Sequence, residues 1–357
     1  MRPSSGAHTD TGRRILLVRL SAMGDIVFAS PLVAAFRRAH PEAHIAWLVQ
    51  PEFRSLLAHH PDLDEVIDWP LRHWQALWRG GRFVALARAV AGLRRDLRIR
   101  RFDRAVDLQG LLKSGLLAWL SGARERIGLG SREGSRWLMT RVVPRGGEAE
   151  RIGSEYLFLA QALGLPAKDF AMAVHPARED RDFAEALIER EGLGGGYAVI
   201  CPFTTRPQKH WLEERWAALA GRIRGEMGLP VVMLGGPADQ PAGERIRAAA
   251  GDAVLDLAGT TSLLGAAALI ERSALVIAVD TGLGHMGIAF RRPSLLLFGS
   301  TCPYRDTTRD DARVLYHPMP CSPCKRRPTC GGRFDCMRAI GVEEVLAAAR
   351  SVMRGAP

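Results

Sequence analysis

The sequence has no long hydrophobic run. No stretch of its 357 residues approaches the roughly 20 consecutive apolar residues that a helix needs to span a bilayer. The opening stretch, MRPSSGAHTDTGRR, has no apolar core behind its charges, so it does not form a secretory signal. We expect residues 1–13 to form a disordered tail. Together these absences predict a cytoplasmic protein that attaches to a membrane, at most, from that side.

One common nucleotide-binding motif is also missing. No G-x-x-x-x-G-K-[ST] occurs, which argues against P-loop enzymes. A G-x-G-x-x-G pattern occurs once, at residues 282–287, after the run Leu275–Val279. The single D-x-D, Asp62-Leu63-Asp64, lies just before an apolar run and is interpreted as a turn. Any bound diphosphate is therefore expected to be neutralised by lysine and a helix dipole, without Mg²⁺.

Positive charge is present in excess and is unevenly distributed. The net charge is +11, with a balance of +9 in residues 1–175 and +2 in residues 176–357. The densest run, residues 93–104, holds six arginines and forms either a solvated helix face or a surface for phosphates. We do not expect nucleic acid as the partner, because the basic residues lack the interleaved aromatic residues of a base-stacking surface.

Short apolar runs alternate with helix-length segments along the whole chain. The runs are Ile15–Val18, Ile45–Val49, Val66–Trp69, Ala105–Leu108, Tyr197–Cys201, Val231–Leu234, Leu275–Val279 and Leu295–Phe298. Nearly continuous apolar strands separated by helices predict parallel sheets covered on both faces. The expected fold is α/β, with two doubly wound, Rossmann-like domains facing a central cleft. We expect these domains at 14–165 and 181–340, a linker at 166–180 and a C-terminal helix at 341–357.

Three loops of the second domain follow predicted strands, where doubly wound sheets bind ligands. The first loop supplies hydroxyls and a cation, from Thr204, Thr205 and Lys209. The second supplies a carboxylate for ribose, from Asp239 or Glu244. The third begins a helix whose N-terminus presents free N–H groups to phosphate, and its candidates are Asp280, Thr281, Gly282 and His285. Any one loop is also compatible with a simple turn or cap, but three in one domain favour a nucleotide diphosphate.

The first domain offers an acid and several cations. Asp25 follows the first apolar run at the start of a helix-like stretch, where it is either a helix cap or a functional acid. Gln109 and Lys113 follow a later run, and Arg72 and His73 lie beside tryptophans that we expect in the core. Arg72, His73 and Lys113 are the candidate anion contacts, because they belong to the basic half.

Four of the six cysteines lie in the segment CSPCKRRPTCGGRFDC, with the spacing C-x2-C-x5-C-x5-C. Four thiolates can close a tetrahedral site around Zn²⁺ or iron. We therefore expect a structural metal site at Cys321, Cys324, Cys330 and Cys336. The alternatives are reduced cysteines in a surface loop, or disulfides that form only after purification, since a cytoplasmic chain should hold no structural disulfide.

Five stretches of the chain together resemble glycosyltransferase family 9, the lipopolysaccharide heptosyltransferases. They are VRLSAMGDIVFASPL, LRHWQALW, AVDLQGLLKSGLLAWLSG, TTRPQKHWLEERW and VDTGLGHMGIAF, in family order, and the first three look most like heptosyltransferase I. The resemblance implies a GT-B fold and an ADP-heptose donor held by the second domain. It also implies inverting transfer without a catalytic metal or other cofactor, to a Kdo–lipid A or inner-core lipopolysaccharide acceptor held by the first domain.

The resemblance also assigns roles to residues. It implies that Asp25 is the general base that takes the acceptor hydroxyl proton as the oxygen attacks the anomeric carbon. It implies that Lys209 binds phosphate, and it leaves open whether Asp239 or Glu244 binds ribose, because the spacing here is longer than in the family. The implied acceptor-binding residues are Ser21, Met23, Gly24, Arg72, His73, Gln109 and Lys113. Most heptosyltransferase I sequences lack the terminal cysteine cluster.

The basic first domain and the implied lipid acceptor predict docking on anionic lipid at the cytoplasmic face of the inner membrane. Two alternatives remain open. One is another family 9 transferase, with a different core sugar or a protein as acceptor. The other is a sugar-nucleotide epimerase on the same two-domain architecture, in which the sugar is never passed to an acceptor.

Overall fold

The structure, a computed structural model, describes residues 13–301, 303–324 and 327–355, so the predicted tail lies almost entirely outside the described residues. Contacts between Cα atoms divide the chain into two compact units. The N-terminal unit comprises the chain up to Ser21, Pro31–Gly146 and Glu155–Phe170. The C-terminal unit comprises Ala22–Ser30, Gly147–Ser154 and the chain from Ala171 onward. Two short segments of the N-terminal half therefore belong, by their contacts, to the C-terminal unit.

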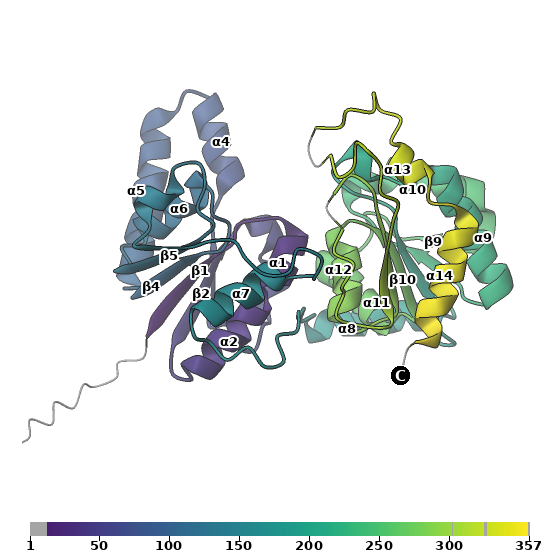
Figure 1. Ribbon diagram of the computed structural model, residues 1–357, viewed down its shortest axis with the longest axis horizontal. Coiled ribbons are helices and arrows are strands. Elements are labelled where there is room, and N and C mark those ends of the chain that lie inside the picture. Colours follow the sequence, from purple (N-terminus) through teal and green to yellow (C-terminus); the bar gives the residue numbers. More distant parts are fainter. Residues whose placement is uncertain (1–12, 302, 325–326, 356–357) are drawn as a thin grey trace, which may run out of the picture. The chain divides into compact units, whose positions relative to one another are not determined.

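The N-terminal unit contains a parallel sheet with the strand order β3-β2-β1-β4-β5-β6 (Figure 1). Its strands are β1 (Arg14–Val18), β2 (His44–Val49), β3 (Glu65–Asp68), β4 (Arg104–Asp107), β5 (Glu125–Leu129) and β6 (Arg141–Val143). Its helices are α2 (Pro31–Ala39), α3 (Ser55–Ala58), α4 (Leu71–Arg79), α5 (Phe83–Ile99), α6 (Leu112–Leu120) and α7 (Ser154–Ala162), with 3-10 turns at Pro51–Phe53 and Ser135–Leu138.

The C-terminal unit contains a second parallel sheet, with the strand order β12-β11-β10-β7-β8-β9. Its strands are β7 (Ala198–Cys201), β8 (Val231–Met233), β9 (Val254–Asp256), β10 (Leu275–Val279), β11 (Ser294–Phe298) and β12 (Ala312–Tyr316). Its helices are α1 (Met23–Ala29), α8 (Arg178–Arg190), α9 (Glu213–Met227), α10 (Gln240–Ala250), α11 (Leu263–Arg272), α12 (Gly282–Ala289), α13 (Asp335–Arg338) and α14 (Val342–Arg354). Its 3-10 turns are Pro207–Lys209, Pro237–Asp239 and Gly251–Ala253.

Helices cover both faces of this second sheet. On one face α9 packs against α10 and α14, and on the other α11 packs against α8 and α12 (Figure 1). Strands covered on both sides need no polar face, which is why every residue of β7, β10 and β11 is buried. All eight apolar runs of the sequence form or overlap strands, so the α/β fold class with two doubly wound sheets is confirmed.

The strand order explains how the candidate donor loops come together. β7 lies between β10 and β8, and all three strands are parallel, so their carboxyl ends share one edge of the sheet. The loops that begin at Pro202, Gly235 and Asp280 therefore start side by side. In the described part of the chain, no helix is both long enough and apolar enough to cross a bilayer.

Candidate active site

Asp280, the residue after β10, is the centre of a polar cluster in the C-terminal unit. Its Oδ2 lies 2.5 Å from Nζ of Lys209 and accepts a 2.7 Å hydrogen bond from Oγ1 of Thr301. Its Oδ1 lies 3.4 Å from Nε2 of His285. The structure thus brings together three predicted donor-site residues from two loops, and it adds a fourth, Thr301, from the loop after β11.

The charge state of Asp280 follows from these neighbours. Burial by itself would raise the pKa of this carboxyl group. The hydrogen bond from His285 and the charge of Lys209 outweigh burial and hold the pKa of Asp280 well below its usual range. Asp280 is therefore an anion at neutral pH, and it holds Lys209 in place at the edge of the sheet.

His285, in the first turn of α12, is fixed from several sides. Its ring is only 3% exposed and lies 4.5 Å from the ring of Phe28, measured between centroids. The hydroxyl oxygen of Tyr304 lies 2.5 Å from Nδ1 of His285. Burial and the nearby charge of Asp280 raise the pKa of Tyr304 well above its usual value, so the hydroxyl keeps its proton and can donate it to Nδ1. Nε2 of His285 then carries the hydrogen that faces Asp280.

Helix α1 packs against the start of α12. A Cβ atom on Gly24 would lie 2.6 Å from Cδ2 of His285, and one on Gly282 would overlap the side chain of Met23. Both glycines are therefore required for close contact between the first turns of the two helices. Met23 and Gly24, predicted to bind acceptor, have this packing role in the structure.

Asp25 is the third residue of α1 and is half-buried. Its Oδ2 accepts a 3.3 Å hydrogen bond from the backbone N–H of Ala22, which is the N-cap residue. The carboxylate thus completes half of a capping box, and Asp25 directly follows Gly24, which abuts the ring of His285. Because residues 22–30 belong to the C-terminal unit, Asp25 lies in the same compact unit as the candidate donor loops.

The loops after β7 and β8 hold the remaining donor candidates. Nε2 of His210 lies 2.8 Å from the backbone oxygen of Thr204, which fastens the loop that carries the exposed Thr205. Asp239 lies at the end of the β8 loop, where its Oδ2 accepts a 2.8 Å hydrogen bond from the N–H of Gly236. Glu244 is exposed on α10, more than one helical turn beyond Asp239.

The acceptor candidates of the N-terminal unit have varied surroundings. Gln109 is buried, and its Oε1 accepts a 3.1 Å hydrogen bond from the N–H of Leu20, so it ties the β4 loop to the end of β1. Nζ of Lys113 lies 6.0 Å from the centroid of the Trp69 ring. The remaining candidates are Ser21, which is half-buried, Arg72, which is exposed and pairs with Glu52, and His73, which is exposed.

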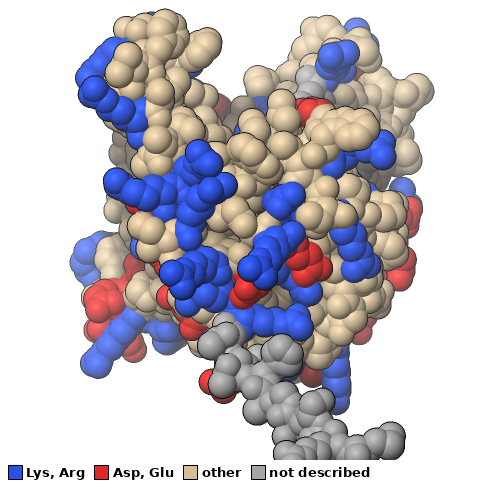
Figure 2. Space-filling model, turned by 90° about the vertical axis from the view of Figure 1, so that its left-hand side faces the viewer, with Lys and Arg blue, Asp and Glu red and all other residues tan. Residues whose placement is uncertain are grey.

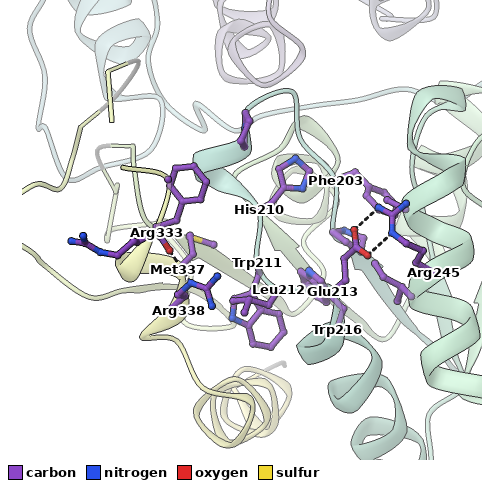
Figure 3. Close-up of a pocket in the computed structure, with 16 residues that line it drawn as sticks. Phe203, His210, Trp211, Leu212, Glu213, Trp216, Arg245, Arg333, Met337 and Arg338 are labelled. Carbon is purple, nitrogen blue, oxygen red and sulfur yellow. Dashed lines mark hydrogen bonds and ion pairs between the residues drawn. The ribbon is translucent and has the colours of Figure 1, made fainter. Parts of the chain in front are cut away.

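A separate cavity of about 520 Å³ lies on the α9 and α10 side of the C-terminal unit. It is lined by Phe203, Trp211, Trp216, Met337 and other residues of the β7 loop, α9, α10 and residues 332–338. Figure 3 shows Glu213 and Arg245 facing one another there, joined by two hydrogen bonds of 2.7 and 2.8 Å. None of the site residues predicted from the sequence lines this cavity.

The predicted four-thiolate metal site receives no support. Among the described residues, no group of three or more His, Cys, Asp or Glu side chains is arranged to hold a metal ion. Cys321, Cys324, Cys330 and Cys336 are free thiols.

Cys336 is buried, and its Sγ packs on Gly299, where a Cβ atom would lie 2.9 Å from it. Burial raises the pKa of the Cys336 thiol, and negative charge on Cys324 or Cys321 would raise it further. The Cys336 thiol is therefore held in its neutral form.

Four residues of these sites were not predicted from the sequence. Phe28, Thr301 and Tyr304 contact His285 or Asp280, and the buried Asp107 accepts 3.0 Å hydrogen bonds from the N–H groups of Gln109 and Gly110. Thr301 and Tyr304 follow the apolar run of β11, so inspection of the residues after every predicted strand would have found them.

Comparison with known proteins decides the family. The model of glycosyltransferase family 9 (heptosyltransferase) matches residues 90–333. The chain belongs to glycosyltransferase family 9. A curated relative in this family is lipopolysaccharide heptosyltransferase 1 of Pseudomonas aeruginosa (strain PAO1), which is 33% identical over 327 residues, covering 89% of this chain and 87% of the relative. The protein is therefore a glycosyltransferase, as the resemblance implied.

Solved structures of this family share the fold. The glycosyl transferase family 9 protein from Veillonella parvula DSM 2008 matches with a TM-score of 0.79 at 22% identity, over 96% of this chain and 97% of that chain. E. coli heptosyltransferase WaaC with ADP-2-deoxy-2-fluoro heptose matches with a TM-score of 0.69 at 24% identity, over 94% and 98% of the two chains. These likenesses confirm the GT-B fold predicted from the sequence.

Proposed function

We propose that this family 9 enzyme transfers heptose from ADP-heptose to the Kdo or inner-core region of lipid A in lipopolysaccharide biosynthesis. The observation that carries the proposal is the cluster of Lys209, Asp280 and His285 at the start of α12, beside the first turn of α1. The names of the relatives support it, since the first of them are lipopolysaccharide heptosyltransferases 1. The match to heptosyltransferase WaaC supports the fold alone.

The donor site, in this proposal, is the sheet edge of the C-terminal unit. The free N–H groups at the start of α12, from Thr281 and Gly282, and the ammonium of Lys209 would meet the diphosphate. The hydroxyls of Thr204 and Thr205 would supply further hydrogen bonds. For the ribose hydroxyls, Asp239 is the better placed acid, because it lies in the loop that follows β8 whereas Glu244 is exposed beyond the first turn of α10.

The chemical step would be a direct displacement with inversion. The acceptor hydroxyl oxygen attacks the anomeric carbon, its proton passes to the carboxylate of Asp25, and the bond from the anomeric carbon to the β-phosphate oxygen breaks. ADP leaves with the electron pair of that bond. The helix dipole of α12 and Lys209 would stabilise the developing phosphate charge, which is the work that a metal ion does in other transferases.

The acceptor would be held by Ser21, Met23, Gly24, Arg72, His73, Gln109 and Lys113. Arg72, His73 and Lys113 suit the carboxylates of Kdo and the phosphates of lipid A because they are cationic or can become so. Gln109 has its side-chain oxygen engaged by Leu20, so its contribution would be to shape the loop.

We further propose that the enzyme works in the cytoplasm, on the inner face of the inner membrane, with the N-terminal unit on anionic lipid. The support is the charge balance of +9 in residues 1–175. On the face shown in Figure 2, Lys and Arg side chains are spread widely, whereas Asp and Glu gather mainly in its lower part. Binding to liposomes is expected to rise with anionic lipid content and to fall with added salt.

Product analysis with ADP-heptose tests the proposal. Incubation with a Kdo–lipid A acceptor is expected to yield heptosylated lipid and free ADP. Transfer only to another core sugar or to a protein would favour a different family 9 transferase, and an altered sugar nucleotide without acceptor would favour an epimerase. A thermal-shift screen of ADP, UDP, GDP and CMP gives an independent readout, since selective stabilisation by ADP is expected.

A further inference from the structure

Large apolar side chains that remain exposed are concentrated in the N-terminal unit. Among the described residues of that unit they are Trp78, Phe83, Val84, Ile99, Leu112, Leu116, Trp119, Trp137 and Val142. In the described C-terminal unit the corresponding side chain is Phe183. Scattered apolar side chains are normal on a protein surface, but a contiguous exposed group indicates a surface that another phase or molecule covers.

Three of these side chains form the tip of the hairpin made by α4 and α5, which lie side by side and extend beyond the sheet in Figure 1. Trp78 is 63% exposed, Phe83 56% and Val84 67%. The rings of Trp78 and Phe83 contact one another edge to face, with centroids 5.3 Å apart. The turn between the helices is Gly80-Gly81-Arg82, and no atom lies within 4 Å of the position of a Cβ on Gly81.

The same hairpin is strongly basic. The stretch from Trp69 to Arg95 contains six arginines and no aspartate or glutamate. Arg79 and Arg82 lie within the tip, between Trp78 and Phe83, and neither pairs with a carboxylate within the described parts of the chain. In the 17-residue helix α5, Leu97 is the buried residue, so the hairpin contributes little to the core of its unit.

A tip with exposed aromatic rings and two unpaired arginines matches the chemistry of one surface in particular. At the boundary between headgroups and acyl chains of an anionic bilayer, guanidinium groups meet phosphates while aromatic rings enter the apolar layer. A second copy of this chain is a poorer partner for the tip, because it would bring an equally basic hairpin and the like charges would repel.

We propose that the tip, Trp78 to Val84, inserts into the headgroup–acyl boundary of an anionic membrane, with Arg79 and Arg82 on lipid phosphates. The proposal rests on the proposed function in one respect, the lipid-linked acceptor. It goes further because it names the apolar residues that enter the membrane. The charge balance of the N-terminal unit predicts only that the unit is attracted to anionic lipid. Insertion would fix the N-terminal unit on the surface that presents the acceptor sugar.

Vesicle binding tests the proposal. The double variant Trp78→Gln/Phe83→Gln and the wild type are sedimented with vesicles of phosphatidylcholine containing phosphatidylglycerol at physiological salt. We expect the variant to lose at least about tenfold in apparent partition, because it removes two aromatic anchors. Matched controls are Trp137→Gln, 83% exposed elsewhere in the N-terminal unit, and Phe183→Gln in the C-terminal unit, and both should bind like the wild type.

Vesicles of brominated lipid give a second readout that does not depend on affinity. Quenching of tryptophan fluorescence is expected for the wild type and for Trp137→Phe, and it should be much weaker for Trp78→Phe. Unchanged partition of the double variant would overturn the insertion, and an equal loss with Trp137→Gln would overturn its location. If the variant alters only self-association in sedimentation equilibrium, the tip is a contact between copies instead.

Turnover separates this inference from the proposed function. With a water-soluble acceptor that lacks acyl chains, the double variant should match the wild type, whereas with acceptor embedded in vesicles its KM should rise. If the wild type transfers heptose to neither acceptor, the proposed function fails and the vesicle-binding result still decides the insertion.

Discussion

The hydroxyl oxygen of Tyr304 lies 2.5 Å from Nδ1 of His285 and occupies the ring nitrogen that faces away from Asp280. Tyr304 therefore determines which nitrogen of the imidazole carries hydrogen toward the carboxylate. Tyr304 is a positioning residue in this arrangement, since it acts through His285.

Tyr304→Phe is expected to lower kcat about tenfold with little change in the affinity for ADP. The substitution removes one hydrogen bond, worth about 1 kcal/mol, and leaves the ring of His285 free to change tautomer. Steady-state kinetics and ADP titration measure the two effects, and the pH profile of kcat should change shape. Tyr316→Phe is the control, because the hydroxyl of Tyr316 bonds Ser322 away from this cluster. A Tyr304→Phe enzyme with the wild-type pH profile would show that the contact is only structural.

Asp25→Asn and Lys209→Ala should separate chemistry from binding. Asn can still accept the N–H of Ala22, so α1 should form normally, but it cannot take a proton, and kcat should fall by about 10² to 10⁴. ADP binding should be retained.

Lys209→Ala should instead weaken ADP binding by about tenfold or more, because it removes a charge-assisted contact. Calorimetry with ADP and kinetics measure both; near wild-type kcat in Asp25→Asn would leave Asp25 with its capping role alone.

Ionisation of Asp280 should make the free energy of unfolding depend on pH in the acid range. Its pKa is lower in the folded protein than in the unfolded chain, where it is about 3.9. Its contribution is therefore complete above that value and is lost as the pH falls below it. Asp280→Asn should cost about 3 kcal/mol at pH 6, and this difference should shrink by about 1 kcal/mol at pH 3. Urea unfolding of both proteins at the two pH values measures it, and a constant difference would contradict the assignment.

Gly24→Ala should destabilise the protein and reduce turnover, because the new methyl group would press on His285 at 2.6 Å. Overpacking of this kind costs about 1–3 kcal/mol. Gly221→Ala is the matched control: Gly221 is exposed in α9, with no atom within 4 Å of the new Cβ, so helix propensity should stabilise the protein by about 0.5–1 kcal/mol. Thermal unfolding with kinetics compares the two, and equal effects would remove the special role of the contact between α1 and α12.

The cysteine cluster should be free of metal. Protein purified without chelator is expected to contain less than about half an equivalent of zinc or iron, with the thiols of Cys321, Cys324, Cys330 and Cys336 all titratable. Elemental analysis and thiol titration decide this. One full equivalent of metal with protected thiols would restore the sequence-based prediction, and it would mean that the segment around Gly299 and Cys336 rearranges when it binds metal.

The sequence predicted the buried strands of both sheets and missed strands nearer the edges. β5, β6, β9 and β12 did not appear as apolar runs, since they are short or carry charged residues such as Arg126, Arg141, Asp256 and Arg313. Three of the four are edge strands, which need fewer apolar residues because one side has no strand neighbour. The hydrophobic pattern therefore identified the central strands of each sheet but, of the four edge strands, only β3.

The donor loops were predictable because parallel strands place their carboxyl ends together. The contacts of His285 were not predictable from the sequence. Its ring is contacted by Tyr304 and by Gly24, and both contacts depend on side-chain packing between distant segments. The metal site predicted from the cysteine segment stays without support. Its spacing satisfies the rule for a metal site, but Cys336 is held by packing on Gly299, which no spacing rule can report.

The packing of α1 on α12 has a consequence for biosynthesis. α1 is made among the first residues of the chain, and its partner follows about 260 residues later. At a synthesis rate of roughly 5–20 residues per second, the segment with Asp25 waits on the order of 10–50 s for the surface that it packs against. The N-terminal sheet can form in that interval. The candidate base is therefore placed only after the C-terminal sheet is complete, so a prematurely terminated chain would be inactive.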